Sequence, residues 1–294
     1  MRSALVRCPE AEVHLWIGPE ASDGFDTADL AAHPRFKLER LRLGDELERA
    51  SSFGDLPQSA IRDVWASLRE RAGQANLARL AILASRGGVY LDTDTLVLRD
   101  LAPLHESSAF CGLEPVLWPV HRARRRDLYG LVGGPSLGVL RTAMAAFPHG
   151  YRWQPSVSKW FSLAANNAVL GMAPGHGLAM EALRRVGHLP AQERTRRYRL
   201  GTHLLQELLA PGGHDVTCYP PRYFYPLGPV LSRHYFRARP DVAQAAQEII
   251  TADTFVVHWY ASVSQLTHWD AQWIQGEGAN TLYGFLCRSV LEAP

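Results

Sequence analysis

Lysine is nearly absent from this 294-residue chain. Lys37 and Lys159 are the only two, so almost all of the 31 basic residues are arginines. Few residues are therefore available as a catalytic lysine. With 29 acidic residues the formal net charge is only +2, which is too small to indicate a nucleic acid or a membrane surface as the partner.

Cysteine is also scarce, and no long apolar run is present. The cysteines form neither a CxxC pair nor a zinc-like cluster, which predicts reduced, mostly buried thiols in a reducing compartment. No stretch approaches the ~20 apolar residues of a membrane span, and the N-terminus lacks the apolar core of a signal peptide. These absences indicate a cytoplasmic protein without a transmembrane segment. The four cysteines are Cys8, Cys111, Cys218 and Cys287.

Strands and helices are expected to alternate over the first hundred residues. Strands are predicted at 12–17, 36–43 and 89–91, and helices at 59–71 and 74–86. In the second helix apolar residues recur at helical spacing, and Gly87 ends it. This alternation indicates an α/β fold with a mostly parallel sheet covered by helices. The chain is long enough for one large domain of this kind or two small ones.

Two carboxylates, Asp92 and Asp94, follow the strand predicted at 89–91. Ligands of parallel sheets bind at the carboxyl ends of the strands. Oxygen ligands at i and i+2 suit Mg²⁺ or Mn²⁺, whose shell a nucleotide diphosphate completes. A DxD pair alone is more often an exposed acidic turn than a metal site, so the surrounding sequence is needed to distinguish the two.

The setting runs from Asn76 to Asp94 and contains Arg79, the pair Gly87-Gly88, and Tyr90. It resembles the DxD-containing sugar-transferase family, which includes glycolipid α1,4-galactosyltransferases, yeast initiating mannosyltransferases and, distantly, the clostridial glucosylating toxins. Asn76 stands where that family usually has Asp. Shorter resemblances follow in order at Ser3-Ala4 with Pro9, Asn166-Asn167-Ala168, Gly201-Thr202-His203-Leu204-Leu205, Phe224-Tyr225-Pro226, Val257-His258-Trp259 and Ser264-Gln265.

The resemblance implies a GT-A (Rossmann-like, nucleotide-sugar-binding) fold and a metal-dependent, retaining glycosyltransferase. The donor would be a nucleotide diphosphate sugar, with UDP-sugar favoured over GDP-sugar. The acceptor would be a hydroxyl of a glycan, a glycolipid or a small molecule. Residues 1–115 would form the nucleotide-sugar-binding half and residues 116–294 the acceptor-binding half of one domain.

The resemblance also assigns roles to residues. The metal, Mn²⁺ or Mg²⁺, would be held by Asp92, Asp94 and His258. The catalytic residues would be Arg79 and Asn167, with Asn166 as the alternative to Asn167. Arg79 could instead be a surface arginine of its helix, and His258 a core histidine. Donor-binding positions would be Asn76, Arg79, Gly88, Tyr90, Asp92, Asp94 and Trp259.

Two other functions compete with this one. The segment from Leu91 to Thr95 also fits the hhDxDxT motif of haloacid-dehalogenase-like phosphatases, in which the first Asp is phosphorylated. That chemistry needs a downstream lysine, and Lys159 is the only one. The second alternative is a protein of the same fold that binds a nucleotide sugar or glycan without turnover, which Asn76 and the start of the chain both suggest.

The resemblance raises one expectation about the start of the chain. GT-A domains open with a central strand, whereas Met1 falls inside what resembles the helix that follows it. We expect either that the annotated start is too late or that another segment takes the place of this strand.

Overall fold

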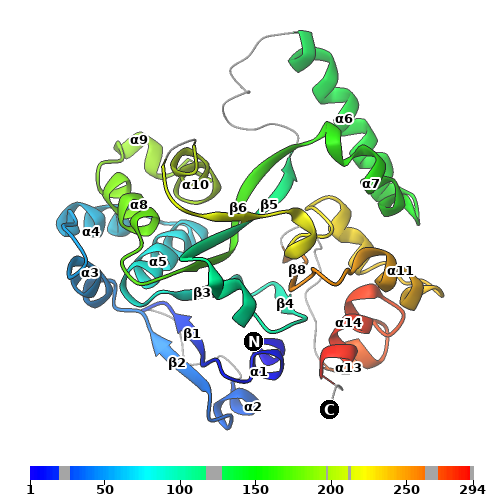
Figure 1. Ribbon diagram of the computed structural model, residues 1–294, viewed down its shortest axis with the longest axis horizontal. Coiled ribbons are helices and arrows are strands. Elements are labelled where there is room, and N and C mark those ends of the chain that lie inside the picture. Colours follow the sequence, from blue (N-terminus) through cyan, green and yellow to red (C-terminus); the bar gives the residue numbers. More distant parts are fainter. Residues whose placement is uncertain (20–26, 117–127, 197, 211–212, 262–270, 292–294) are drawn as a thin grey trace.

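The computed structural model describes residues 1–294 except 20–26, 117–127, 197, 211–212, 262–270 and 292–294. Helices pack around three small sheets (Figure 1). The α/β class predicted from the sequence is therefore confirmed. Within the described residues, none of the helices has both the length and the apolar character that crossing a bilayer requires.

The N-terminal part alternates as predicted. Its elements are α1 (Arg2–Arg7), β1 (Val13–Ile17), α2 (Ala28–Ala31), β2 (Phe36–Arg40), α3 (Leu43–Ser51), α4 (Gln58–Ser67), α5 (Arg71–Arg86), β3 (Gly88–Leu91) and β4 (Thr95–Val97). The strand predicted over 36–43 stops at Arg40. Leu43 begins α3 instead, because α3 buries Leu43 and Leu47 in one core cluster with Leu77 and Leu80 of α5.

The remaining part is longer and less regular. Its strands are β5 (Ala109–Val116), β6 (Ser162–Met172), β7 (Thr217–Tyr219) and β8 (Val256–His258). Its α-helices are α6 (Leu128–Ala146), α7 (Gln154–Val157), α8 (Gly177–Gly187), α9 (Ala191–Arg194), α10 (Leu204–Leu208), α11 (Val242–Ile249), α13 (Ala271–Gln275) and α14 (Leu282–Leu291). Short helical turns are η1 (Ala102–Glu106), η2 (Gly150–Trp153), η3 (Ser158–Trp160), η4 (Arg199–His203), η5 (Pro221–Tyr223) and η6 (Leu231–Tyr235).

The prediction of a mostly parallel sheet is wrong. The largest sheet has the order β3-β6-β5-β7, in which β6 runs antiparallel to both β3 and β5 and only β7 lies parallel to β5. β1 and β2 form a separate parallel pair, and β4 pairs antiparallel with β8. The helices α3, α4 and α5, which precede β3, follow β1 and β2, and these strands belong to a different sheet from β3. The alternation of strands and helices along the chain therefore did not reveal which strands are neighbours.

The expected first strand has no counterpart between the sheets in the part of the chain that the structure describes. There β1 is hydrogen-bonded to β2 alone and β3 to β6 alone. The expectation about the start of the chain stays a prediction.

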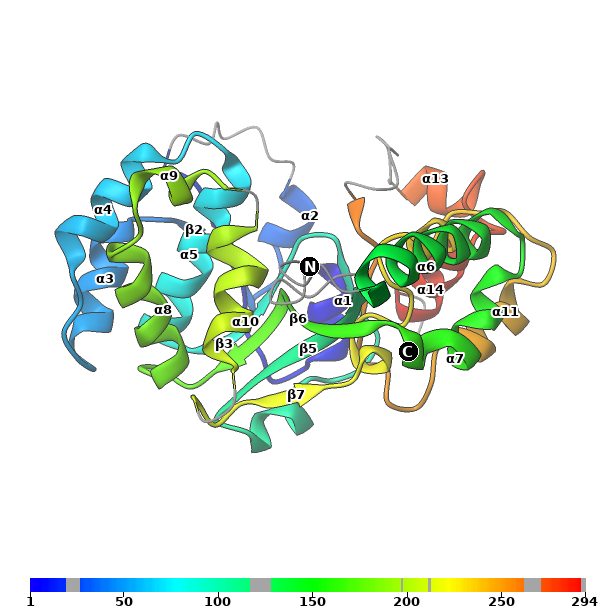
Figure 2. The same ribbon diagram turned by 90° about the horizontal axis from the view of Figure 1, so that it is seen from above.

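Three clusters of buried apolar side chains pack the helices against the sheets. One packs α3, α4, α5, α8 and α10 against β3 and β6, and these helices gather on one side of the molecule in Figure 2. A second joins α6, α11 and α14 to β4 and β8 on the other side. A third, under the large sheet, includes Phe110, Phe224 and Val256. The short strands β3, β4 and β8 are thereby fixed by burial of apolar side chains, the main favourable contribution to folding.

All four cysteines are free, and three of them are buried, as expected. Cys111 of β5 lies opposite the exposed Cys218 of β7, with the two sulfur atoms 3.6 Å apart. The hydrogen bond from Cys111 lowers the pKa of the Cys218 thiol to about 7, although partial burial opposes this shift. Cys218 is therefore largely a thiolate just above neutral pH.

We expect iodoacetamide to alkylate Cys218 before the other cysteines, at a rate that rises with pH through a midpoint near 7. In Cys111→Ala the midpoint should move up toward the ordinary thiol value of about 8.5, since the donor is gone. Peptide mass mapping across pH 5.5–9.5 measures both profiles, with Cys287, whose thiol pKa burial raises, as internal control. An unchanged midpoint in Cys111→Ala would refute the sulfur–sulfur hydrogen bond.

Candidate metal and donor site

The DxD turn joins β3 to β4, and the strand beside it fixes its shape. The main-chain N–H of Asp92 donates to the carbonyl oxygen of Ala168 in β6, at 2.8 Å. The Thr95 hydroxyl donates back to the carbonyl oxygen of Asp92, at 2.7 Å. Both carboxylates of the turn therefore project from a backbone that hydrogen bonds hold at each end.

β8 brings His258 to this turn. In the antiparallel β4–β8 pair, His258 lies opposite Thr95, the residue after Asp94. Its Nε2 is 3.0 Å from Oδ1 of Asp94, and the main-chain N–H of Ala261 donates to Oδ2 at 2.8 Å. Burial acts to raise the pKa of Asp94, but the bonds from His258 and Ala261 outweigh it and hold that pKa below its usual value. Asp94 is thus ionised at neutral pH.

Asp92, Asp94 and His258 can each offer one ligand atom, and these atoms lie within 4.8 Å of one another. Two carboxylates and an imidazole form a donor set suited to Mn²⁺, and the carboxylates alone suit Mg²⁺. The hydrogen bonds from Arg79 and Tyr90 to Asp92 both fall on Oδ1, which leaves Oδ2 for a cation. The three residues predicted as metal ligands therefore lie together in an arrangement that fits one.

Arg79 is a buried residue of α5 and not a surface arginine, with only 4% of its surface exposed. It donates to Oδ1 of Asp92 at 2.9 Å, to the Tyr90 hydroxyl at 3.1 Å and to the carbonyl oxygen of Asn167. The Tyr90 hydroxyl donates to the same Asp92 oxygen at 2.7 Å, and burial raises the Tyr90 pKa, so the phenol stays neutral. A buried guanidinium requires such pairing because its desolvation is costly.

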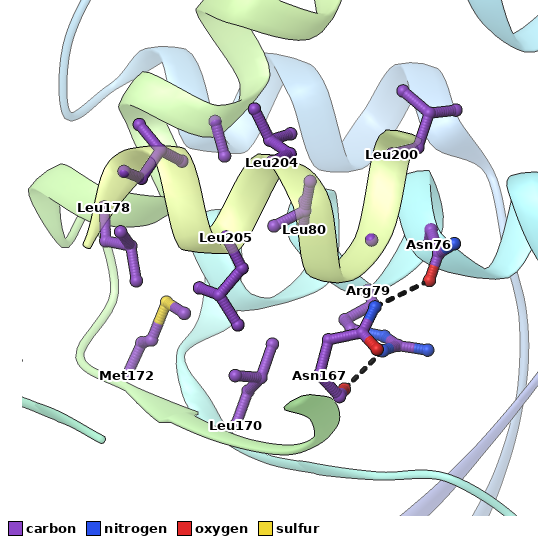
Figure 3. Close-up of a pocket in the computed structure, with 13 residues that line it drawn as sticks. Asn76, Arg79, Leu80, Asn167, Leu170, Met172, Leu178, Leu200, Leu204 and Leu205 are labelled. Atoms are coloured by element: carbon purple, nitrogen blue, oxygen red, sulfur yellow. Dashed lines mark hydrogen bonds between the residues drawn. The ribbon is translucent and has the colours of Figure 1, made fainter. Parts of the chain in front are cut away.

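Asn76 and Asn167 meet beside Arg79 (Figure 3). The Asn167 side-chain amide donates to Oδ1 of Asn76 at 2.9 Å. Behind them lies a cavity of about 20 Å³ with mostly leucine walls. That volume holds roughly one water molecule and is too small for a sugar ring.

Close packing against Asn76 and Asn167 explains why the segment 201–205 begins with a glycine, Gly201. A β-carbon there would lie 2.7 Å from Nδ2 of Asn167 and 3.1 Å from Nδ2 of Asn76. The main chain of Gly201 is also non-helical within η4. The resemblance noted in this segment therefore has a physical reason, which is close packing of the main chain on the amide pair.

Gly88 and Trp259, two other residues predicted to bind the donor, differ in how they lie relative to the DxD turn. Gly88 begins β3 at the end away from Asp92, and its φ of +91° is one that glycine adopts readily. Trp259 holds the turn through its main chain, since its N–H donates to the carbonyl oxygen of Asp94 at 3.1 Å. Its ring packs edge-on against Tyr283 of α14, at 4.8 Å between centroids. Ser264-Gln265 lie outside the described residues.

Sequence reasoning missed Glu114 of β5, which is nearly buried and accepts a hydrogen bond from the Tyr260 hydroxyl at 2.9 Å. Burial raises its pKa, against the hydrogen bonds from Asn166 and Tyr260 that lower it. The available signal was a lone charged residue inside the apolar strand segment 109–116, because such residues are seldom buried without a partner.

The comparison with protein families bears on this same part of the chain. Residues 26–111 match the family described as "Glycosyltransferase sugar-binding region containing DXD motif". The matched range includes Asn76, Arg79, Asp92 and Asp94, so the resemblance inferred from the sequence is confirmed. Together with the α/β architecture it supports a fold of the GT-A type.

Other comparisons add little. No curated protein matches this sequence. Among solved structures, the ligand-free glycosyltransferase domain from the YGT toxin aligns at 12% identity and a TM-score of 0.28, over 55% of this chain and 36% of that one. Backbones that differ this much do not inform one another's fold or activity.

The close packing of Gly201 on the side-chain amides of Asn76 and Asn167 can be tested by substitution. Gly201→Ala should lower the free energy of unfolding by about 1–3 kcal/mol, as overpacking does, because its β-carbon would push Asn76 and Asn167 apart. Urea unfolding measures the change. Gly138→Ala in α6 is the matched control, since its β-carbon meets nothing within 4 Å, and it should be stabilising by about 0.5–1 kcal/mol. Equal stabilities of Gly201→Ala and wild type would contradict the proposed packing.

Proposed function

We propose that this protein is a metal-dependent, retaining glycosyltransferase. It transfers a sugar from a nucleotide diphosphate sugar, with UDP-sugar favoured, to a hydroxyl acceptor. The observation that carries the proposal is the Asp92–Asp94–His258 cluster inside and beside the matched sugar-binding region. The free thiols of all four cysteines fit a cytoplasmic location for this activity.

The chain's own residues have distinct tasks in this proposal. A divalent cation, when bound by Asp92, Asp94 and His258, offsets the charge that grows on the departing diphosphate. Arg79 fixes the Asp92 carboxylate through Oδ1. The amides of Asn76 and Asn167 meet beside Arg79, where they present hydrogen-bonding groups to the hydroxyls of the donor sugar.

The stereochemistry is part of the proposal and follows from the family resemblance. In a retaining transfer by front-face displacement, the acceptor hydroxyl attacks the face from which the diphosphate leaves. A donor phosphate oxygen accepts its proton, so no side chain is nominated as the base. Residues 1–115 provide the donor-binding half in this proposal and residues 116–294 the acceptor-binding half.

Asn76 supports a second candidate, which is binding of the nucleotide sugar without turnover. A carboxylate at this position would only accept hydrogen bonds, whereas the Asn76 amide also donates them, so it holds a sugar hydroxyl differently. Hydrolysis of UDP-sugars in the presence of Mn²⁺ separates the candidates, because only the enzyme releases UDP. We do not propose a phosphatase, since Lys159 is an exposed residue of η3 and the family match is to glycosyltransferases.

Asp94→Ala should reduce Mn²⁺-dependent release of UDP by at least two to three orders of magnitude, on the order of the loss seen when one transition-state-stabilising group is removed. The fold should stay intact, because Arg79 is paired with Asp92 and not with Asp94. Coupled detection of UDP measures turnover, and circular dichroism checks the fold. Asp253→Ala, at an exposed aspartate paired with Arg222, is the control. Near-normal Mn²⁺-dependent turnover in Asp94→Ala would defeat the metal assignment.

His258→Ala should weaken Mn²⁺-dependent donor binding more than it lowers the melting temperature of the metal-free protein. A ligand bound only by the native state raises the melting temperature, so melting with and without Mn²⁺ and a panel of UDP- and GDP-sugars measures both effects. His234→Ala is the matched control, because His234 is also buried but bonds to the carbonyl oxygen of Met144. It should melt lower yet keep the ligand-induced rise. The same pattern in His258→Ala would make His258 a core residue.

A further inference from the structure

Glu114 lies behind the metal cluster and not in it. Its side chain is buried in β5, and two donors converge on its carboxylate. One is the Tyr260 hydroxyl, which donates to Glu114 at 2.9 Å. The other is the side chain of Asn166, which lies diagonally across the β5–β6 pair, opposite Gly112, and acts to lower the pKa of Glu114. These side chains belong to two separate segments: the first contains His258 of the cluster, and the second is hydrogen-bonded to the main chain of Asp92.

The first segment runs through Tyr260 to Asp94. Tyr260 has a φ of +54°, a left-handed conformation that is unfavourable for a residue with a large side chain. Its ring lies on the imidazole of His258, with 4.0 Å between ring centroids. The next residue, Ala261, donates its main-chain N–H to Oδ2 of Asp94. The bond to Glu114 therefore holds a strained residue whose position sets those of both His258 and Ala261.

The second segment runs through Asn166 to Asp92. Oδ1 of Asn166 accepts the main-chain N–H of Ala168 at 2.7 Å. The carbonyl oxygen of Ala168 in turn accepts the main-chain N–H of Asp92 at 2.8 Å. Asn166 thus fixes the stretch of β6 against which the first carboxylate of the DxD turn is aligned.

We propose that Glu114 is a positioning residue for the divalent-cation site, because it ties the Tyr260 segment and the Asn166 segment to a single buried carboxylate. The proposal deepens the proposed function and rests on it for the identity of the ligand. A glutamine at this position removes the negative charge and replaces one acceptor oxygen with an amide group that can only donate, so the attachment of the two segments weakens.

Glu114→Gln keeps the shape of the side chain and tests this proposal in two ways. In the metal-free protein, hydrogen–deuterium exchange should become at least tenfold faster at the amides of Asp92 and Ala261. With Mn²⁺ alone as the probe, the dissociation constant measured by calorimetry should rise about 10–100-fold, as when residues that orient metal ligands are lost. The exchange measurement needs no metal, so it decides the positioning role even if the wild type binds no Mn²⁺, an outcome that would count against the proposed function alone.

Glu46→Gln is the matched control. Glu46 is also a buried carboxylate, but it lies in α3 and accepts from Ser85 and Arg86. It should destabilise the protein without changing exchange at Asp92 and Ala261 or the affinity for Mn²⁺. If the two variants behave alike, or if Glu114→Gln leaves exchange at both amides unchanged, the proposal is overturned.

Tyr260→Phe covers the case in which Glu114→Gln does not fold. It removes the hydroxyl that Glu114 accepts from and leaves the Asn166 segment intact. Exchange should then become faster at Ala261 but not at Asp92, and the affinity for Mn²⁺ should fall by less than in Glu114→Gln. Unchanged exchange at Ala261 in Tyr260→Phe would contradict the role assigned to Glu114.

Discussion

The buried guanidinium of Arg79 is the constraint on which the site depends. It connects α5, β3 and β6 through Tyr90, Asp92 and the main chain of Asn167. Removal of one partner of a buried ion pair costs about 3–5 kcal/mol because the other charge is left uncompensated. Asp92 therefore stabilises the fold, and its carboxylate is also one of the groups that could hold a cation. Asp94 has different partners, His258 and Ala261.

An irregularity in the β5–β6 pairing leaves main-chain groups of β6 available to the site. Cys111 pairs with Leu170, yet the next residue of β5, Gly112, pairs with Asn166, so residues 167–169 have no partner on β5. Their main-chain groups bond to other parts of the site, including Arg79 and the Tyr225 hydroxyl. A regular ladder would have used the same groups to hold β5. As in other sheets, a departure from regular pairing lies beside a candidate active site.

The sequence predicted the relations between residues that are close along the chain. It did not predict the relations that depend on pairing between distant strands. Asn76, Arg79 and the two aspartates lie within one segment of helix, turn and strand, so their spacing fixed their relation. Asn167 and His258 were located by resemblance to a family. Glu114 was not predicted as a site residue, and the left-handed backbone of Tyr260 was not foreseen, because the β5–β6 and β4–β8 pairs that place them join distant parts of the chain. The antiparallel course of β6 was missed for the same reason.

The pairing of β4 with β8 has a consequence for the way the chain is made. The partner strand, 256–258, is synthesised long after β4, whose Leu96 and Val97 are buried in the finished protein. On the ribosome, Leu96, Val97 and the Asp94 carboxylate therefore remain without their native neighbours until β8 has been synthesised. Unpaired strands with exposed apolar residues are prone to misassociate. The nascent chain is thus prone to misassociation until the 256–261 segment emerges, and the Asp92–Asp94–His258 cluster can be completed only then.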